Sequence, residues 1–340
     1  MLRRVTQQHR EVIAAPFLSL TIAGRKVVPM RSLLHCRSLF CTIIFQTIVA
    51  TACRAEQPSV KSEGPANWPQ KVVVTVGDIR TRIHGPKMWT LSGIDYQNAV
   101  MATEESAYGT VLTIRNVGHL GTAHFLDVPG KPGAVEKEDV THLQLFVDDK
   151  PVNELSPMMS LTGESFRMER RSKIRALDLD STITIRKGVL TETARFRVTE
   201  PIDLQNAYPW MYAWTPQATD YVFGDDKGIQ KRGAFLKEGK TAAEVVRNAT
   251  WMAVYNSANR KGSVCCFLKH PANTERSFLL IDAPGVYRKV AAYTLVDRIV
   301  SKGFEGTYQS AVGFFTATES DWEEQAQRRA AELRSSESMP

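Results

Sequence analysis

Histidines and carboxylates gather in one short stretch of the chain. His119, His124 and His142 lie within 24 residues, and the same stretch holds three acidic side chains: Glu136, Glu138 and Asp139. Glycines and prolines in 118–133 predict a loop, where functional side chains concentrate. Histidine exchanges protons near neutral pH, which suits it to general acid–base work, and two histidines with a carboxylate can hold a divalent metal. Solvated loop histidines bonded to the backbone are the third interpretation, and the spacing leaves all three open.

Four aromatic residues recur at every second position between 208 and 214: Tyr208, Trp210, Tyr212 and Trp214. On one strand this period places all four rings on the same face. A row of rings with polar edges suits stacking on sugar rings, because the apolar face of a sugar meets the aromatic face. The same row also suits the core of a sandwich. We therefore expect either a saccharide platform or core packing.

A third group, Tyr287, Arg288 and Lys289, follows Asp282 on a predicted strand. Tyr287 and Lys289 share one face of that strand, and Arg288 points to the other. A tyrosine and an arginine near a histidine would suit β-elimination from a uronic acid. The arginine would neutralise the carboxylate while the histidine or tyrosine removes the acidified proton. The alternative is a solvated strand face.

Motifs of several other enzyme classes are missing from the sequence. It has no glycine-rich phosphate loop, no Gly-x-Ser-x-Gly elbow and no His-Glu-x-x-His zinc helix. Only Cys265 and Cys266 follow residue 55, so the sequence predicts neither a disulfide framework nor a cysteine-based zinc site. We expect no cofactor and assign no metal ligand.

The elements that must position these residues are strands. The clearest hairpin is 181–198, where apolar and polar residues alternate on both sides of Lys187-Gly188. Only the C-terminus predicts a helix, with a capping box over Ser320–Glu323 and one apolar face: Trp322, Ala326, Ala330 and Leu333. We expect an all-β fold, a large antiparallel β-sandwich over 71–318, followed by a short C-terminal helix and tail over 319–340.

Residues 1–55 have the composition of a targeting segment. They hold eight of the 43 Lys and Arg residues but a single acid, Glu11, of the 36 in the chain. An uncharged run over 39–52 then ends in small residues, which is typical of a secretory signal and too short to span a bilayer. Such a signal could begin at Met30, with an upstream extension before it. Cleavage near Ala52 or Ala55 is expected, and lipidation of Cys53 is the lesser alternative.

The rest of the chain carries no net charge. After a polar linker over 56–70, the body balances its basic and acidic residues at 35 each once the first 55 residues are removed. A neutral body has no electrostatic footprint for nucleic acid. We therefore expect an exported protein, periplasmic or extracellular, with no transmembrane span in its mature chain and no nucleic-acid partner.

Five segments in this order resemble the galactose-mutarotase-like β-supersandwich, in a branch of largely uncharacterised exported bacterial proteins. They are GTVLTIRN (109–116), GHLGTAHFLDVPGKPG (118–133), YPWMYAWTPQATDY (208–221), DAPGVYRK (282–289) and AVGFFTAT (311–318). The resemblance implies an aldose epimerase, a polysaccharide-lyase domain or a sugar-binding module. Epimerases of this fold pair a late carboxylate base with a histidine acid. The late carboxylates here are Asp297, Glu305 and Glu319, and Arg115-Asn116 reverses the order of the epimerase Asn-Arg pair.

Together these patterns predict an exported protein that binds or processes carbohydrate at an epimerase-like or lyase-like site. The expected catalytic residues are His119, His124, His142, Tyr287 and Arg288. The expected substrate-binding residues are Tyr208, Trp210, Tyr212, Trp214 and Lys289. The rival hypothesis is a non-catalytic envelope or extracellular module whose aromatic residues all belong to the core.

Overall fold

The computed structural model describes residues 68–104, 109–122, 136–271 and 274–335. The predicted signal and Cys53 lie outside these residues, as do nearly all of the predicted linker and His124. Within the described ranges no helix is long and apolar enough to cross a membrane.

A nine-stranded sheet forms one layer of the fold. From edge to edge it runs β17 (Ala242–Arg247), β20 (Ser277–Ala283), β21 (Tyr287–Tyr293), β14 (Met211–Trp214), β4 (Ala99–Ala102), β3 (Thr90–Tyr96), β2 (Ile79–His84), β1 (Lys71–Val76) and β9 (Met158–Gly163). Neighbours are antiparallel except β1 and β9, which are parallel. The sheet joins strands from both ends of the described chain, so its residues come together only on folding.

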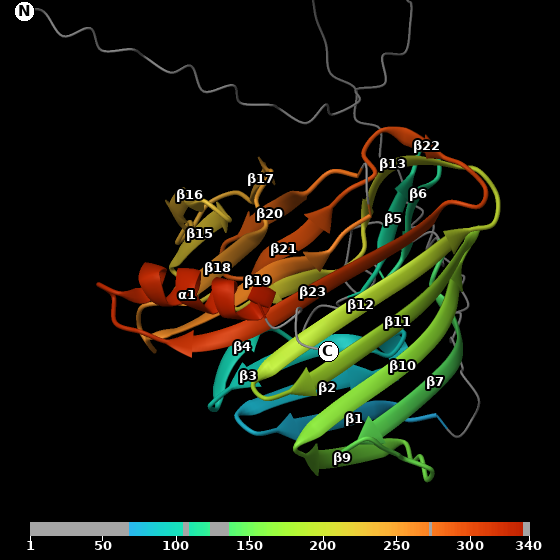
Figure 1. Cartoon of the computed structure of the whole chain (residues 1–340), viewed down its shortest axis with the longest axis horizontal. Helices are drawn as coiled ribbons and strands as arrows, with labels where there is room; N and C mark the ends of the chain where they lie inside the picture. The colour runs from blue at the N-terminus through green and yellow to red at the C-terminus, as the bar shows by residue number, and fades with distance from the viewer. Residues whose placement is uncertain (1–67, 105–108, 123–135, 272–273, 336–340) are drawn as a thin grey trace, which may run out of the picture. The chain divides into compact units, whose positions relative to one another are not determined.

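A ten-stranded sheet forms the facing layer. Its order is β16 (Gly228–Ala234), β15 (Asp220–Asp225), β18 (Trp251–Asn256), β19 (Lys261–Lys269), β23 (Glu305–Thr316), β12 (Val189–Val198), β11 (Leu177–Arg186), β10 (Ser165–Ile174), β7 (Asp139–Val147) and β8 (Lys150–Pro151). Figure 1 shows the long strands β7, β10, β11, β12 and β23 side by side as one curved layer.

A small third sheet carries part of the candidate site. It consists of β22 (Arg298–Val300), β13 (Ile202–Tyr208), β5 (Val111–Ile114) and β6 (Gly118–Gly121). A short 3-10 turn over Gly85–Lys87 and one α-helix, α1 (Trp322–Ser335), complete the described elements. The predicted fold class, an all-β sandwich with a short C-terminal helix, is confirmed.

The hairpin predicted around Lys187-Gly188 is present as β11 and β12. Both turn residues are left-handed, at φ 51° and 72°, which is the conformation that a two-residue hairpin turn requires. Ile183 and Ile185 point into the core from β11, while Thr182 and Thr184, which alternate with them, are half-buried. The sequence alternation therefore marks the two faces of this hairpin.

The main hydrophobic core lies between the two large sheets. It joins side chains of the nine-stranded sheet, such as Val72 and Val74, to side chains of the ten-stranded sheet, such as Ile185 and Leu190. Its largest fully buried members include Trp89, Trp210, Trp214, Tyr212, Phe223 and Phe278. Each such side chain stabilises the fold by about 1.5–3 kcal/mol through burial alone.

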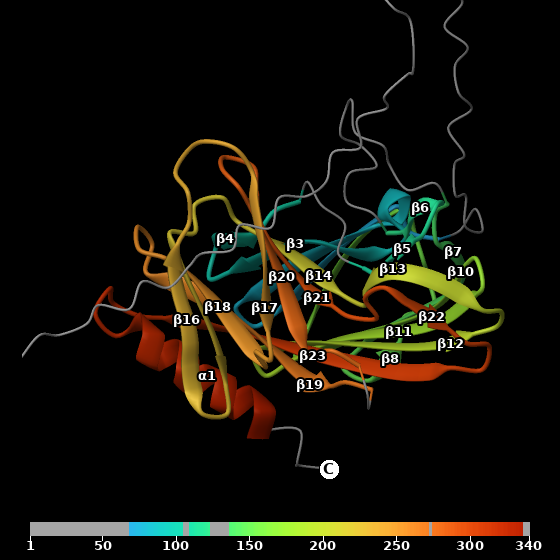
Figure 2. The same cartoon turned by 90° about the horizontal axis from the view of Figure 1, so that it is seen from above.

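Helix α1 packs across β18, β19 and β23 on the ten-stranded sheet (Figure 2). The four residues of its predicted apolar face are all buried there, and the Trp322 ring stacks on Tyr255 at 5.1 Å. The predicted capping box is wrong in detail. Because the helix begins at Trp322, Asp321 takes the cap position, and its carboxylate accepts a hydrogen bond from the Thr318 backbone N–H at 2.6 Å.

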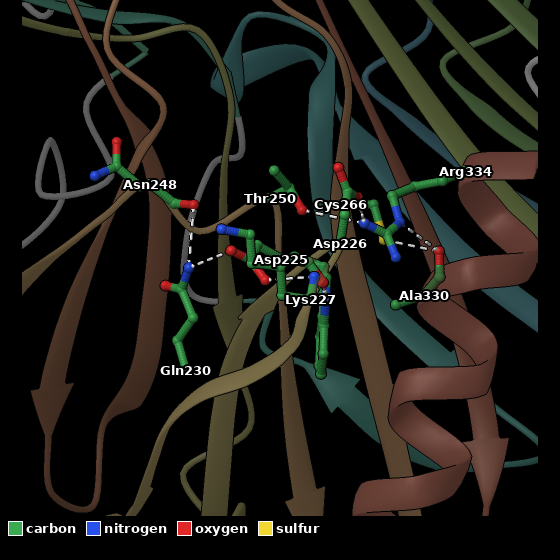
Figure 3. Close-up of polar contacts among 10 residues, drawn as sticks. Asp225, Asp226, Lys227, Gln230, Asn248, Thr250, Cys266, Ala330 and Arg334 are labelled. Atoms are coloured by element: carbon green, nitrogen blue, oxygen red, sulfur yellow. Dashed lines mark hydrogen bonds and ion pairs between the residues drawn. The ribbon is translucent and has the colours of Figure 1, made fainter.

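The C-terminal turn of α1 is fastened by Arg334. Its Nη1 ion-pairs with Asp226 and lies 3.2 Å from the Thr250 hydroxyl oxygen, and its Nε donates to the Ala330 carbonyl at 3.2 Å (Figure 3). The Cys266 thiol contacts the same carbonyl at 3.8 Å. This helix therefore fixes the turn before β18 as well as the sheet beneath it.

Candidate functional site

His119 is held by two polar residues of neighbouring strands. It lies opposite Thr113 in the pairing of β6 with β5, and its Nδ1 is 3.0 Å from the Thr113 hydroxyl oxygen. That hydroxyl donates its only hydrogen to the Asn206 amide oxygen, also at 3.0 Å. His119 Nδ1 must therefore be the donor toward Thr113, which leaves the lone pair of the neutral ring on Nε2.

The surroundings of His119 favour this neutral ring. Burial lowers the pKa of His119 below its ordinary value, and the positive charge of Lys289 lowers it further. Both effects disfavour the imidazolium form. His119 is thus a proton acceptor at neutral pH, oriented by Thr113 and Asn206.

Lys289 is buried beside the ring of Tyr208. It is 3% exposed, and its Nζ lies 5.6 Å from the centre of the Tyr208 ring, within range of a cation–π interaction. The Tyr208 ring is 5.8 Å from that of Tyr293. Burial raises the pKa of both tyrosines, so both phenols stay protonated and can donate hydrogen bonds. We call His119, Tyr208, Lys289 and Tyr293 the outer-face site, because Lys289 points away from the main core.

The register of β21 explains this orientation. Arg288 pairs with Trp214 and Lys289 pairs with Ala213 of β14, so alternate residues of β21 face opposite sides of the nine-stranded sheet. Tyr293, four residues beyond Lys289, returns to the same side. The predicted split of Arg288 from Lys289 is therefore present, and only Lys289 reaches the outer-face site.

One late carboxylate lies near the edge of this site. Asp297 is close enough to raise the pKa of Tyr293, and its carboxylate pairs with Arg115 Nη2 at 3.0 Å. Asp203 also pairs with Arg115, at 3.3 Å. Because both carboxylates are engaged by one exposed guanidinium, this group forms a surface ion-pair cluster beside the site.

The aromatic row of residues 208–214 does not form one strand face. Tyr208 ends β13 in the small sheet, whereas Tyr212 and Trp214 lie on β14 in the nine-stranded sheet, and the chain changes sheet at Pro209. Trp210, Tyr212 and Trp214 are all 0% exposed in the main core. Their rings therefore offer no open face for a sugar, and the core interpretation holds for these three. Tyr208 alone lies at the outer-face site.

Arg288 is committed to a structural ion pair. Its Nη1 pairs with the buried Asp282 and its Nη2 donates to the Leu236 carbonyl at 2.7 Å. The guanidinium also lies 4.9 Å from the centre of the Phe235 ring. Tyr287, half-buried at the start of β21, has a pKa raised by burial. The predicted clamp on a substrate carboxylate is thus at odds with the contacts of Arg288, which hold the loop before β17.

The histidine-rich window is divided between two sheets. His142 lies half-buried on β7, opposite Arg171 in the ten-stranded sheet, whereas His119 lies on β6 in the small sheet. Within the described ranges no group of three or more His, Cys, Asp or Glu side chains could hold a metal ion. The described histidines of this window therefore lie on two different sheets, and His124 lies outside the described residues.

Two carboxylates of the window are structural. Glu138 is buried, accepts a hydrogen bond from the Thr122 hydroxyl at 2.6 Å and pairs with Arg170 at 3.1 Å. Glu136 pairs with Arg175 at 2.9 Å. These contacts tie the end of β6 and the start of β7 to β10, and so fix the strand that carries His119.

Three residues of the site escaped the sequence reasoning. Thr113, Asn206 and Tyr293 lie far apart in the chain and belong to no shared motif. The signal that could have revealed Thr113 is a polar residue inside an apolar strand, the run VLTI. A buried polar residue needs a hydrogen-bond partner, so such a position indicates a network.

Comparison with solved structures shows similarity in fold. A GH36 alpha-galactosidase from Geobacillus stearothermophilus is 9% identical, with 77% of this chain and 42% of that chain covered and a TM-score of 0.48. A galactose mutarotase-like protein from Lactobacillus casei is 8% identical, with 72% and 100% covered and a TM-score of 0.42. A galactose mutarotase related enzyme from Lactobacillus acidophilus is 7% identical, with 73% and 98% covered and a TM-score of 0.39.

This chain thus spans about two fifths of the alpha-galactosidase and nearly the whole of the mutarotase-like proteins. The two Lactobacillus proteins are galactose mutarotase-like or mutarotase related, and the sequence of this chain resembles the same family. No protein-family model matches the sequence. No curated protein matches it either.

Proposed function

We propose that this protein binds a saccharide at the outer-face site and processes it with His119 as the proton acceptor. The observation that carries the proposal is the His119 ring, kept neutral by burial and Lys289 and oriented through Nδ1 by Thr113. Tyr208 and Tyr293 supply ring faces and phenol hydroxyls, which suit the apolar faces and hydroxyl edges of a sugar.

The chemistry follows from a neutral base beside a cationic acid. His119 Nε2 takes a proton from the substrate, and the Lys289 ammonium gives one to the oxygen whose bond to carbon breaks. In an epimerase-like reaction the first proton leaves the anomeric hydroxyl and the second reaches the ring oxygen. In a lyase-like reaction the first proton leaves the carbon beside a uronate carboxyl and the second reaches the departing glycosidic oxygen. In the epimerase-like reaction, ring closure returns both protons and restores the enzyme. In the lyase-like reaction, His119 releases its proton to solvent and Lys289 takes one from solvent.

We further propose that the protein acts outside the cytoplasm. The support for this is the basic, then apolar, then small-residue pattern of residues 31–55. A fusion of residues 1–55 to a reporter enzyme active only after export tests it. Activity of the exported reporter supports the proposal, and a reporter that stays inactive inside the cell contradicts it.

The binding experiment uses the full-length chain and calorimetric titration with monosaccharides and oligosaccharides. His119→Asn keeps an N–H toward Thr113 but removes the base, so binding should persist while turnover is lost. Lys289→Met should weaken both. Lys150→Met, on the exposed strand β8, is the matched control and should alter neither.

Two results would contradict the proposal. The first is saccharide turnover that survives His119→Asn. The second is the absence of saccharide binding by a folded chain, which would favour the non-catalytic module.

A further inference from the structure

A cleft of about 550 Å³ opens where β17 and β19 end and β20 begins. The lining residues on which the argument depends are Arg247, Asn248, Thr250, His270, Glu275 and Arg276. None of them belongs to the outer-face site. The cleft therefore needs its own chemical interpretation.

The cleft carries an excess of positive charge. Arg247 and Arg276 are both exposed, and neither forms an ion pair within the part of the chain that the structure describes. The one carboxylate in the lining, Glu275, accepts a hydrogen bond from the Leu295 backbone N–H at 3.0 Å. His270 lies 2.7 Å from the Glu275 carbonyl oxygen. Two guanidiniums thus face one partly engaged carboxylate.

One wall of the cleft is held in place from both sides. The Asn248 N–H donates to the Arg276 carbonyl at 2.8 Å. This bond links the segment just after Arg247 to the segment that carries Arg276. Figure 3 shows Gln230 in contact with the Asn248 carbonyl and Arg334 of α1 in contact with Thr250. Gln230 is itself bound to Asp225 at 2.8 Å. A rigid wall lowers the entropy cost of holding a ligand.

A row of residues connects the cleft to the outer-face site. Arg247 pairs with Ser277 of β20, and Ser277 pairs with Tyr293 of β21. The three side chains lie on the same side of the sheet, with Arg247 and Tyr293 about 10 Å apart across two strand spacings. The charge of Arg247 reaches Tyr293, whose pKa it lowers against the raising effects of burial and Asp297.

We infer that this cleft binds the anionic group of an acidic saccharide whose neighbouring unit occupies the outer-face site. Guanidinium groups bind carboxylate and sulfate through paired, charge-assisted hydrogen bonds, and two of them face this cleft. The inference deepens the proposed function and rests on it. It also moves the anion site from Arg288, whose charge is balanced by Asp282, to Arg247 and Arg276.

The test measures binding to the full-length chain by calorimetry at low ionic strength. The probes are trigalacturonate, its methyl ester, a sulfated galactose oligosaccharide and inorganic sulfate. The variants are Arg247→Gln, Arg276→Gln and His119→Asn. The matched control is Arg195→Gln, an exposed arginine on β12 that likewise forms no ion pair within the described residues. Its substitution removes the same charge from the other large sheet.

We expect an acidic probe to bind at least tenfold more tightly than the methyl ester. Each cleft variant should abolish most of that preference, because a hydrogen bond between charged groups is worth roughly a factor of ten in affinity. Arg195→Gln should preserve it. Tighter trigalacturonate binding identifies a uronate, and tighter binding of the sulfated oligosaccharide identifies a sulfate ester.

The failures can be told apart. Equal binding of acidic and methylated probes would overturn the anion cleft while leaving the proposed function intact. Sulfate binding lost in Arg247→Gln and Arg276→Gln, without any saccharide binding, would overturn the proposed function and the acidic-saccharide inference, leaving only an anion site. An equal loss of the preference for acidic probes in Arg195→Gln would also overturn the inference, because the preference would then depend on the net charge of the protein and not on the cleft.

Discussion

The Lys289 ammonium interacts with both Tyr208 and His119: it lies 5.6 Å from the centre of the Tyr208 ring, and its charge lowers the pKa of His119. One buried cation thus links an aromatic surface to a proton acceptor. The two partners come from different strands, β13 and β6, and meet Lys289 only because the small sheet packs beside β21.

Removing this cation should raise the pKa of His119. In Lys289→Met the pKa is expected to move toward the ordinary value of 6.5 but to stay below it, because burial is the larger cause of the shift. Proton-detected NMR titration of the histidine Cε1–H signals measures this directly. An unchanged His119 pKa in Lys289→Met would contradict the coupling.

The lowered pKa of His119 also affects stability. A neutral buried histidine contributes stability above the pKa of 6.5 that it has when unfolded, and this contribution is lost as the pH falls through its lower folded value. His119→Asn should therefore flatten the fall in unfolding free energy below pH 6.5. Urea unfolding between pH 5 and 8 measures it, and parallel curves for the two proteins would refute the prediction.

Glu192 should make the protein less stable as the pH rises. Its carboxyl lies in the core near Tyr212, and burial raises its pKa to about 8. The folded state holds a proton that the unfolded chain releases near the ordinary glutamate pKa of 4.5, so stability declines as the pH rises from about 4.5 to about 8. Glu192→Gln should remove that decline. A slope that persists in the variant would show that another group causes it.

The tryptophans of the predicted platform should act on folding alone. Trp214→Ala removes a fully buried ring and is expected to cost about 3–5 kcal/mol of unfolding free energy. Trp214→Phe keeps most of the volume and should retain the saccharide affinity of the parent chain. If folded Trp214→Phe bound saccharide more than tenfold more weakly, Trp214 would have to contact the saccharide, which would contradict the prediction.

The ion pair of Arg288 should be needed for structure. Asp282→Asn leaves a buried guanidinium without its counter-charge and is expected to cost about 3–5 kcal/mol. The double variant Asp282→Leu with Arg288→Met replaces both charges with apolar groups and should recover most of this loss. Denaturant unfolding of the three proteins measures it, and full stability of Asp282→Asn would contradict the assignment.

The fold class could be predicted from local patterns because strand alternation and turn chemistry act over a few residues. The 181–198 hairpin and the apolar face of α1 are examples. The position of the aromatic residues 208–214 could not be predicted in the same way, because period-two spacing does not reveal that the chain leaves one sheet for another at Pro209. His119, Tyr208 and Lys289 were each identifiable by residue type. Their juxtaposition, and the partners Thr113, Asn206 and Tyr293, depend on pairings between distant strands that no sequence window contains.

The most direct test of saccharide binding at the outer-face site is a histidine-selective NMR titration of the full-length chain. The His119 signal is assigned by its loss in His119→Asn, and a neutral and an acidic oligosaccharide are added in turn. We predict that the His119 signal shifts saturably with at least one of them and that the shift is absent in Lys289→Met. A saccharide that binds by calorimetry yet leaves the His119 signal unmoved would contradict the site.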